Sequence, residues 1–208
     1  FYTGAMAHAK NLTFRELAPD ADLVVISPTD PQAMQSYIRE CKELRIPYIY
    51  DPSQQTIRLS GTELREGVDG CFLLTANQYE FHLIQERTGL SSEEIMDLAG
   101  GVLVTAGADG STLAIDGEEW HIPVVKPAEI VEPTGAGDAF RAGLIRGIEL
   151  GLPWPIAGRM GALASAYVLE NIGTQNHRFT AEGFVERFRQ DFDDKGALDT
   201  LLIPQTAK

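Results

Sequence analysis

Residues 23–50 read LVVISPTDPQAMQSYIRECKELRIPYIY and contain a strand, a helix and a second strand in succession. The apolar run Leu23–Ile26 lies between a charged residue and a Ser-Pro turn, which is typical of a short buried strand. Asp30 can cap a helix with Pro31 at its first position, and apolar side chains then recur at helical spacing. The second strand, Ile46–Tyr50, ends before a proline. Such a unit predicts parallel strands joined by a right-handed crossover.

The same alternation continues along the rest of the chain. Further strands are expected at Cys71–Thr75, Val102–Thr105, Ser111–Ile115 and Glu118–Ile122, the last two joined by an Asp116-Gly117 hairpin turn. Helices are expected at Thr62–Glu66, Asn77–Gly89, after Ser91, and at Gly137–Leu150, Pro155–Leu169 and Thr180–Phe192. This pattern predicts one α/β domain with a mostly parallel sheet covered by helices on both faces. Ligands of such sheets bind beyond the carboxyl ends of the strands.

The composition excludes several classes of protein. Of 208 residues, 44% are apolar and 23% are charged, which is ordinary for a soluble globular chain and unlike disordered or fibrous proteins. The net charge of -13, without a basic run, argues against nucleic acid or anionic membranes as partners. No apolar run approaches the roughly 18 residues that a membrane span needs. Two cysteines, Cys41 and Cys71, form no disulfide framework, which favours a cytoplasmic location.

The most informative segment runs from Glu132 to Gly143 and reads EPTGAGDAFRAG. A glycine-rich turn feeds directly into a helix, so free backbone N–H groups and the positive end of the helix dipole meet at an anion site. Gly135 and Gly137 allow a ligand to approach the backbone. The Asp138 carboxylate would repel a phosphate bound at this site. Its presence is explained if it takes a proton from a hydroxyl that attacks a phosphoryl group. The alternative is that Asp138 only complements the helix dipole.

The PTGAGDAF run followed by Ala-Gly resembles the C-terminal signature of the ribokinase-like (PfkB) sugar and nucleoside kinases. The resemblance implies a three-layer α/β/α fold, ATP as cosubstrate and Mg²⁺ as cofactor. It also implies that Asp138 is the catalytic base and that the amides of Gly135, Ala136 and Gly137 form the anion hole. Thr134 would belong to the residues that bind the nucleotide.

Two further motifs follow strands and resemble family motifs. Asn77 and Glu80 match the Asn-x-x-Glu pattern, which implies that they hold Mg²⁺ through water; a helix cap followed by an acidic first turn is the alternative. Thr105, Gly107 and Gly110 match the Thr-x-Gly-x-x-Gly nucleotide loop, although such glycines also serve ordinary turns. The resemblance implies that the helix expected at residues 155–169 walls the adenine pocket.

Many family members bind K⁺ between the start of the signature and a later loop, here Gly173–His177. This chain has Glu132 where the family usually has Asp, and His177 where a hydroxyl residue is common, although the longer Glu could still reach K⁺. Arg141, one turn after Asp138, could face the carboxylate or a phosphate.

The chain starts at Phe1 without an initiator Met. We expect residues 1–208 to be the nucleotide-binding and catalytic portion of one PfkB-type domain, with the N-terminal strands and the lid absent. The segments 1–6, 51–55 and 173–177 look most like bacterial members of the adenosine-kinase type.

The expected function is therefore ATP-dependent phosphorylation of a primary hydroxyl of a nucleoside, adenosine to AMP. A ribokinase- or fructokinase-type sugar kinase and a lid-less nucleotide-binding fragment are the alternatives. A dinucleotide-binding oxidoreductase lacks its Gly-x-Gly-x-x-Gly fingerprint. In some family members the lid strands pair between subunits, so a homodimer is also considered.

Overall fold

The computed structural model describes residues 4–203, and its contacts divide the chain into two compact units. The first contains residues up to 107 together with 112–120, and the second contains 108–111 and the chain from 121 onward. The assignment of residues 1–208 to one kinase domain stays a prediction.

The strands form one six-stranded sheet in which sequence order is also spatial order. They are β1 (Val24–Ile26), β2 (Tyr48–Tyr50), β3 (Leu73–Asn77), β4 (Gly101–Thr105), β5 (Ser111–Ile115) and β6 (Glu118–Ile122). The first four are parallel, with Val24 opposite Tyr48, Ile49 opposite Leu73 and Asn77 opposite Thr105. The expected α/β fold with a mostly parallel sheet is confirmed, and a helical layer on its second face stays a prediction.

The helices also follow the sequence pattern closely. They are α1 (Phe14–Leu17), α2 (Pro31–Leu44), α3 (Gly61–Val68), α4 (Gln78–Thr88), α5 (Ser92–Leu98), α6 (Ala136–Glu149), α7 (Trp154–Leu169) and α8 (Ala181–Asp191). The Asp30 carboxylate accepts hydrogen bonds from the amides of Gln32 and Ala33, as expected of an N-cap. Two kinds of element were not predicted from the sequence: α1, and the short 3-10 helices at Gly4–Asn11, Ser53–Ile57, Gly107–Asp109 and Ala197–Leu202. Within residues 4–203, no helix is both long enough and apolar enough to cross a membrane.

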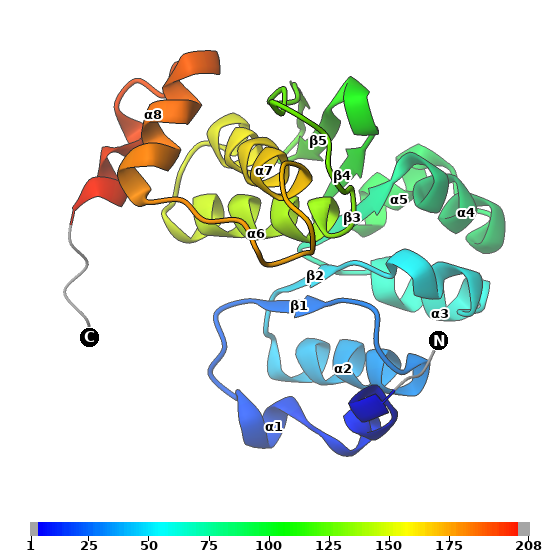
Figure 1. Cartoon of the computed structure of the whole chain (residues 1–208). Coiled ribbons are helices and arrows are strands. Elements are labelled where there is room, and N and C mark those ends of the chain that lie inside the picture. The colour runs from blue at the N-terminus through cyan, green and yellow to red at the C-terminus, as the bar shows by residue number, and fades with distance from the viewer. Residues whose placement is uncertain (1–3, 204–208) are drawn as a thin grey trace. The chain divides into compact units, whose positions relative to one another are not determined.

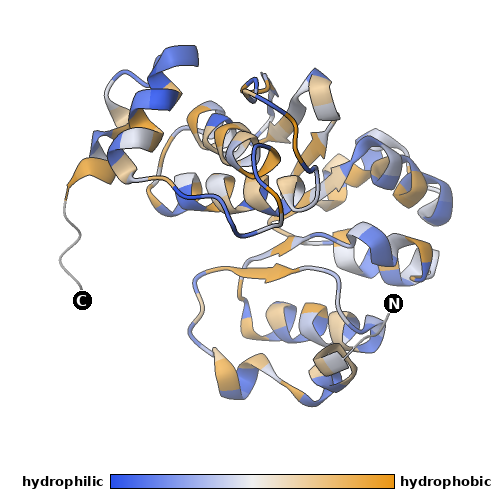
Figure 2. Ribbon diagram, in the orientation of Figure 1, coloured by the Kyte–Doolittle hydropathy of each residue, from blue (hydrophilic) through white to orange (hydrophobic). Residues whose placement is uncertain are grey.

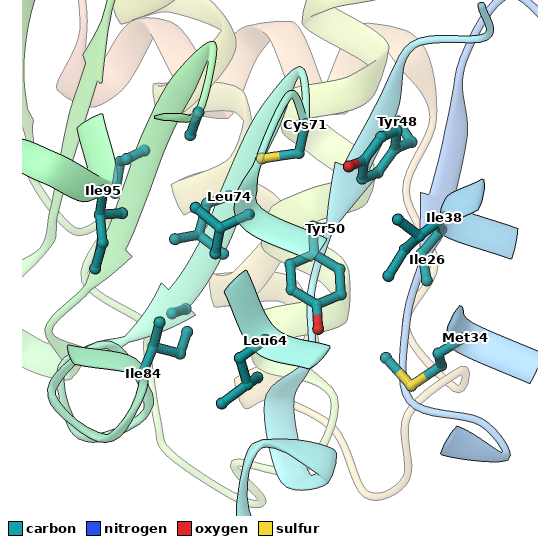
Figure 3. Close-up of a cluster of buried hydrophobic side chains, with 14 of the residues drawn as sticks. Ile26, Met34, Ile38, Tyr48, Tyr50, Leu64, Cys71, Leu74, Ile84 and Ile95 are labelled. Carbon is teal, nitrogen blue, oxygen red and sulfur yellow. The ribbon is translucent and has the colours of Figure 1, made fainter. Parts of the chain in front are cut away.

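The core of the first unit lies between the parallel strands and α2 to α5 (Figure 3). Ile26, Tyr48 and Leu74 contribute side chains from three neighbouring strands, and all three are almost completely buried. The Tyr48 hydroxyl donates to the carbonyl oxygens of Gly67 and Asp69, so its polar atom is satisfied in an apolar setting. Along α2, apolar residues recur at helical spacing among polar ones, because one side of the helix is buried (Figure 2).

In the second unit, α6 and α7 lie side by side and approach through glycines (Figure 1). A Cβ on Gly143 would lie 2.6 Å from the Met160 carbonyl oxygen, and one on Gly147 would lie 2.5 Å from the Ala157 Cβ. These distances are too short for any side chain, so the separation of the two helices depends on glycine. This contact sets the position of α6, whose first turn carries the signature residues.

Replacing Gly147 with Ala is expected to lower the free energy of unfolding by about 1–3 kcal/mol, because the new methyl group must push α7 away. Urea denaturation measures this change. Gly183→Ala in α8 is the control, since its Cβ would meet only the Thr180 hydroxyl at 3.5 Å. Equal stability of the two variants would contradict the proposed close packing.

Candidate active site

The N-terminus of α6 offers unpaired backbone donors. Gly135 is the N-cap residue and has a φ of 89°, and no side chain caps the helix. The first helical bond runs from the Ala139 amide to the Gly135 carbonyl, and the Ala136 amide reaches the Pro133 carbonyl at 3.2 Å. The amides of Gly137 and Asp138 lie in the first turn, before that bond, where helical N–H groups have no intrahelical acceptor. These two amides are therefore the best placed to hold an anion.

The two glycines of this turn have different reasons to be glycine. Gly135 has a left-handed backbone, and a Cβ there would also lie 2.9 Å from the Thr174 Cγ2. At Gly137, in contrast, no described atom beyond its chain neighbours and its own helix backbone lies within 4 Å of an added Cβ. The neighbouring protein atoms do not require glycine at position 137, but a ligand lying against this backbone would.

Asp138 is the acidic residue of the same first turn. Its side chain is 75% exposed and forms an ion pair with Arg141, whose side chain is only 17% exposed. The carboxylate is thus accessible to a substrate hydroxyl, and its ion pair with the mostly buried Arg141 side chain limits its movement. Its position also complements the helix dipole, so both explanations given for Asp138 fit this geometry.

A pocket of about 490 Å³ opens beside this turn in the second unit. Its lining is mostly apolar and comes from α6 with its N-cap, α7, α8, the loop between α7 and α8, and the 3-10 helix Ala197–Leu202. The lining residues are Gly135, Asp138, Ala139, Ala142, Gly143, Arg146, Met160, Ala164, Thr174, His177, Phe179, Ala181, Phe184 and Leu201. An apolar pocket that ends at a carboxylate and a helix N-terminus can hold a flat ring with an anionic tail.

The sequence analysis did not single out the aromatic wall of this pocket. Phe179 packs against Tyr167 and Phe184 at centroid distances of 4.7 and 5.1 Å, and the His177 ring stacks on Phe179. The only sequence signal was that aromatic residues follow the Gly173–His177 loop. Their common location depends on tertiary packing.

Glu132 connects the signature segment to the Gly173–His177 loop. Its Oε2 accepts a hydrogen bond from the Gly173 amide at 2.8 Å, and the Thr134 hydroxyl also bonds to its carboxylate. These bonds hold the pKa of Glu132 below its usual value, so the group is ionised at neutral pH. N–H and O–H donors thus use two of the roughly four acceptor positions of this carboxylate, and a K⁺ ion at this place stays a prediction.

The first unit holds Asn77, Glu80, Thr105 and Gly107, whereas Gly110 belongs to the second. Asn77 and Glu80 form a capping box for α4: Asn77 Oδ1 accepts from the Glu80 amide at 2.8 Å, and Glu80 Oε2 accepts from the Asn77 amide at 2.9 Å. The capping alternative is therefore present in the structure. A carboxylate has about four acceptor positions, so Glu80 can still bind a hydrated Mg²⁺.

The sheet register brings Asn77 next to Thr105, the first residue of the expected nucleotide loop, at the carboxyl ends of β3 and β4. Gly107 and Gly110 both have positive φ, and a Cβ on Gly110 would lie 2.3 Å from the Ile122 carbonyl oxygen. The turn itself thus accounts for Gly110, whereas the role of this loop in binding nucleotide stays a prediction.

Comparison with known proteins relates this chain to nucleoside kinases. The nucleoside kinase of Methanocaldococcus jannaschii is 26% identical over 193 residues, which are 91% of this chain and 62% of that protein. The nucleoside kinase of Thermoplasma acidophilum is 30% identical over 166 residues, covering 76% of this chain and 53% of that protein. The structure of Burkholderia thailandensis nucleoside kinase in complex with ADP-inosine superposes with a TM-score of 0.87 at 32% identity, over 90% of this chain and 59% of that one.

The chain therefore spans less than two thirds of the length of these relatives. The family model described as pfkB family carbohydrate kinase matches residues 1–180, which include the Gly-Ala-Gly-Asp turn, the Asn77–Glu80 pair and the Thr105 loop. With its ribokinase-like fold, the chain belongs to the pfkB family of carbohydrate kinases.

Proposed function

We propose that the chain provides the nucleotide-binding and catalytic part of an ATP-dependent kinase that phosphorylates a primary hydroxyl of a nucleoside, giving the 5′-monophosphate. The observation that carries this proposal is the first turn of α6, where the exposed Asp138 carboxylate adjoins the unobstructed backbone of Gly137. A base next to an anion site is the arrangement that phosphoryl transfer to a hydroxyl needs.

In this mechanism, Asp138 takes the proton of the substrate hydroxyl as its oxygen forms a bond to the γ-phosphorus of ATP. The bond from that phosphorus to the β–γ bridging oxygen breaks, and ADP leaves. The ion pair with Arg141 orients the exposed carboxylate. The amides of residues 135–138 lie around the position of the transferring phosphoryl group, and those of Gly137 and Asp138 donate to its developing charge. Because these donors belong to a helix, they need no reorganisation during the reaction.

The pocket of the second unit would hold the adenosine part of ATP, with Met160 and Ala164 of α7 against the adenine ring. Thr134, Thr105, Gly107 and Gly110 are proposed as further nucleotide contacts. Asn77 and Glu80 would bind Mg²⁺ through water. When bound, Mg²⁺ neutralises charge on the β- and γ-phosphates.

Adenosine is the proposed acceptor, and the relatives support a nucleoside in general. Three of them are described as nucleoside kinases, and the Burkholderia thailandensis enzyme was also solved in complex with inosine. A sugar kinase is the second candidate, because a ribokinase of Lactococcus lactis is 29% identical over 163 residues. A lid-less fragment that binds nucleotide without catalysis is the third. We place the reaction in the cytoplasm, with small molecules and, in the homodimer alternative, a second copy as partners.

A substrate panel separates these candidates. Adenosine, inosine, cytidine, ribose and fructose are each supplied with Mg·ATP, and ADP release is measured beside ATP binding by calorimetry. The nucleoside proposal expects the highest kcat/KM with adenosine. A preference for ribose or fructose would favour the sugar kinase, and ATP binding without turnover of any acceptor would favour the binding fragment.

Replacing Asp138 with Asn removes the proposed base and keeps the shape of the side chain. We expect kcat to fall by about 100- to 10,000-fold while the Kd for ATP changes little. Asp191→Asn, at the exposed C-terminal end of α8, is the matched control and should leave both values unchanged. Equal losses of turnover and ATP affinity in Asp138→Asn would argue against the base assignment.

Gly137→Ala tests the anion site. The added methyl group meets no described protein atom, so the melting temperature should stay the same or rise slightly, since Ala favours helix by about 1 kcal/mol. The methyl group would instead occupy space needed by the phosphate, and we expect the Kd for ATP to rise about tenfold, which is ~1.4 kcal/mol. Unchanged affinity would show that the phosphate does not contact this backbone.

A further inference from the structure

Glu132 joins three segments of the second unit. The amides of Val131 and Glu132 donate to the Leu169 carbonyl at the end of α7, at 2.8 and 3.3 Å. The Glu132 carboxylate accepts from the Gly173 amide, 41 residues later in the chain, and from the Thr134 hydroxyl. One side chain thus ties the segment that leads into α6 to the Gly173–His177 loop.

The two tied segments line the same pocket. Gly135 and Asp138 line it from the start of α6, and Thr174 and His177 line it from the Gly173–His177 loop. The contact between Gly135 and Thr174 leaves no room for even a methyl group. A shift of the Gly173–His177 loop would therefore change the wall of the pocket next to the first turn of α6.

The loop also has its own positive charge. Arg178 donates through Nη1 to the carbonyl oxygens of Gln175 and His177, at 2.7 Å each. Asn176 donates through Nδ2 to the Ile172 carbonyl at 2.6 Å. The backbone oxygens of Ile172, Gln175 and His177 thus accept bonds from side chains of residues 176 and 178. Each of these bonds uses one lone pair of a carbonyl oxygen, and the guanidinium at two of them repels a metal ion.

We propose that Glu132 and Arg178 together do the work of a monovalent cation: the carboxylate holds the Gly173–His177 loop against the start of α6, the guanidinium binds the carbonyl oxygens of Gln175 and His177, and nucleotide binding needs no K⁺. Glu132 is a positioning residue for the pocket and does not touch the reacting atoms. This inference rests on the proposed binding of ATP.

The test measures binding of a non-hydrolysable ATP analogue with Mg²⁺ by calorimetry, in potassium chloride and in tetramethylammonium chloride at equal ionic strength. The unaltered chain should give Kd values within about twofold of each other in the two salts. A large gain of affinity in potassium would overturn the inference. Absence of binding in both salts would instead overturn the proposed function.

Variants of the two residues separate their roles. Glu132→Ala should weaken binding about tenfold in both salts, and Glu132→Gln less, because its amide oxygen can still accept from Gly173. Arg178→Ala frees the carbonyls of Gln175 and His177, so its affinity should fall in tetramethylammonium and partly recover in potassium. Glu129→Ala, a neighbouring exposed glutamate, is the control and should bind as the unaltered chain does.

Melting temperatures accompany these measurements. If Glu132→Ala does not fold, Glu132→Gln and Arg178→Ala still decide the question. Binding by either of these two at the unaltered affinity in both salts would contradict the role assigned to that residue.

Discussion

The left-handed turn at Gly135 is the constraint on which the candidate site depends. With a φ of 89° and Thr174 Cγ2 only 2.9 Å from where a Cβ would lie, this position favours glycine. The turn starts α6 without a side-chain cap, which leaves the first-turn amides open. It also brings Asp138 to the exposed side of the helix and Gly135 to the wall of the pocket. The proposed anion site, the proposed base and the pocket therefore share one backbone feature.

The acidic character of the chain bears on how it can bind a polyanion. The net charge is -13, and two cationic side chains of α6 are paired with carboxylates: Arg141 with Asp138, and Arg146 with Glu149 at 2.6 Å. In the proposed function, phosphate recognition would thus depend on backbone N–H groups more than on a basic surface. Amide donors at a helix N-terminus suit this task, because their orientation is set by the helix and they bring no net charge of their own.

Much of the fold could be predicted from local patterns. The boundaries of α2 and α4 agree with prediction because Asp30, Asn77 and Gly89 act within one turn of the helix they begin or end. The helix α1 was missed because its four residues are too few to show a period, and the helix is tied to α2 by bonds from Thr13 and Phe14 to Glu40. The sequence pattern also allowed Asn77 and Glu80 to cap α4, and the structure shows that each side chain accepts a bond from the backbone amide of the other residue.

The sequence by itself determined the alternation of strands and helices, the family signature and the residue types able to do phosphoryl transfer, because periodicity, capping and glycine-rich turns act over a few residues. Tertiary structure decided which of those residues meet. It placed Asn77 beside Thr105, formed an aromatic pocket next to Asp138, and gave Glu132 a partner 41 residues away. It also directed the Glu132 carboxylate toward hydrogen-bond donors, which the identity of the residue left open. Such pairings depend on how helices and loops pack, and packing is a property of the whole unit, so no short stretch of the chain encodes it alone.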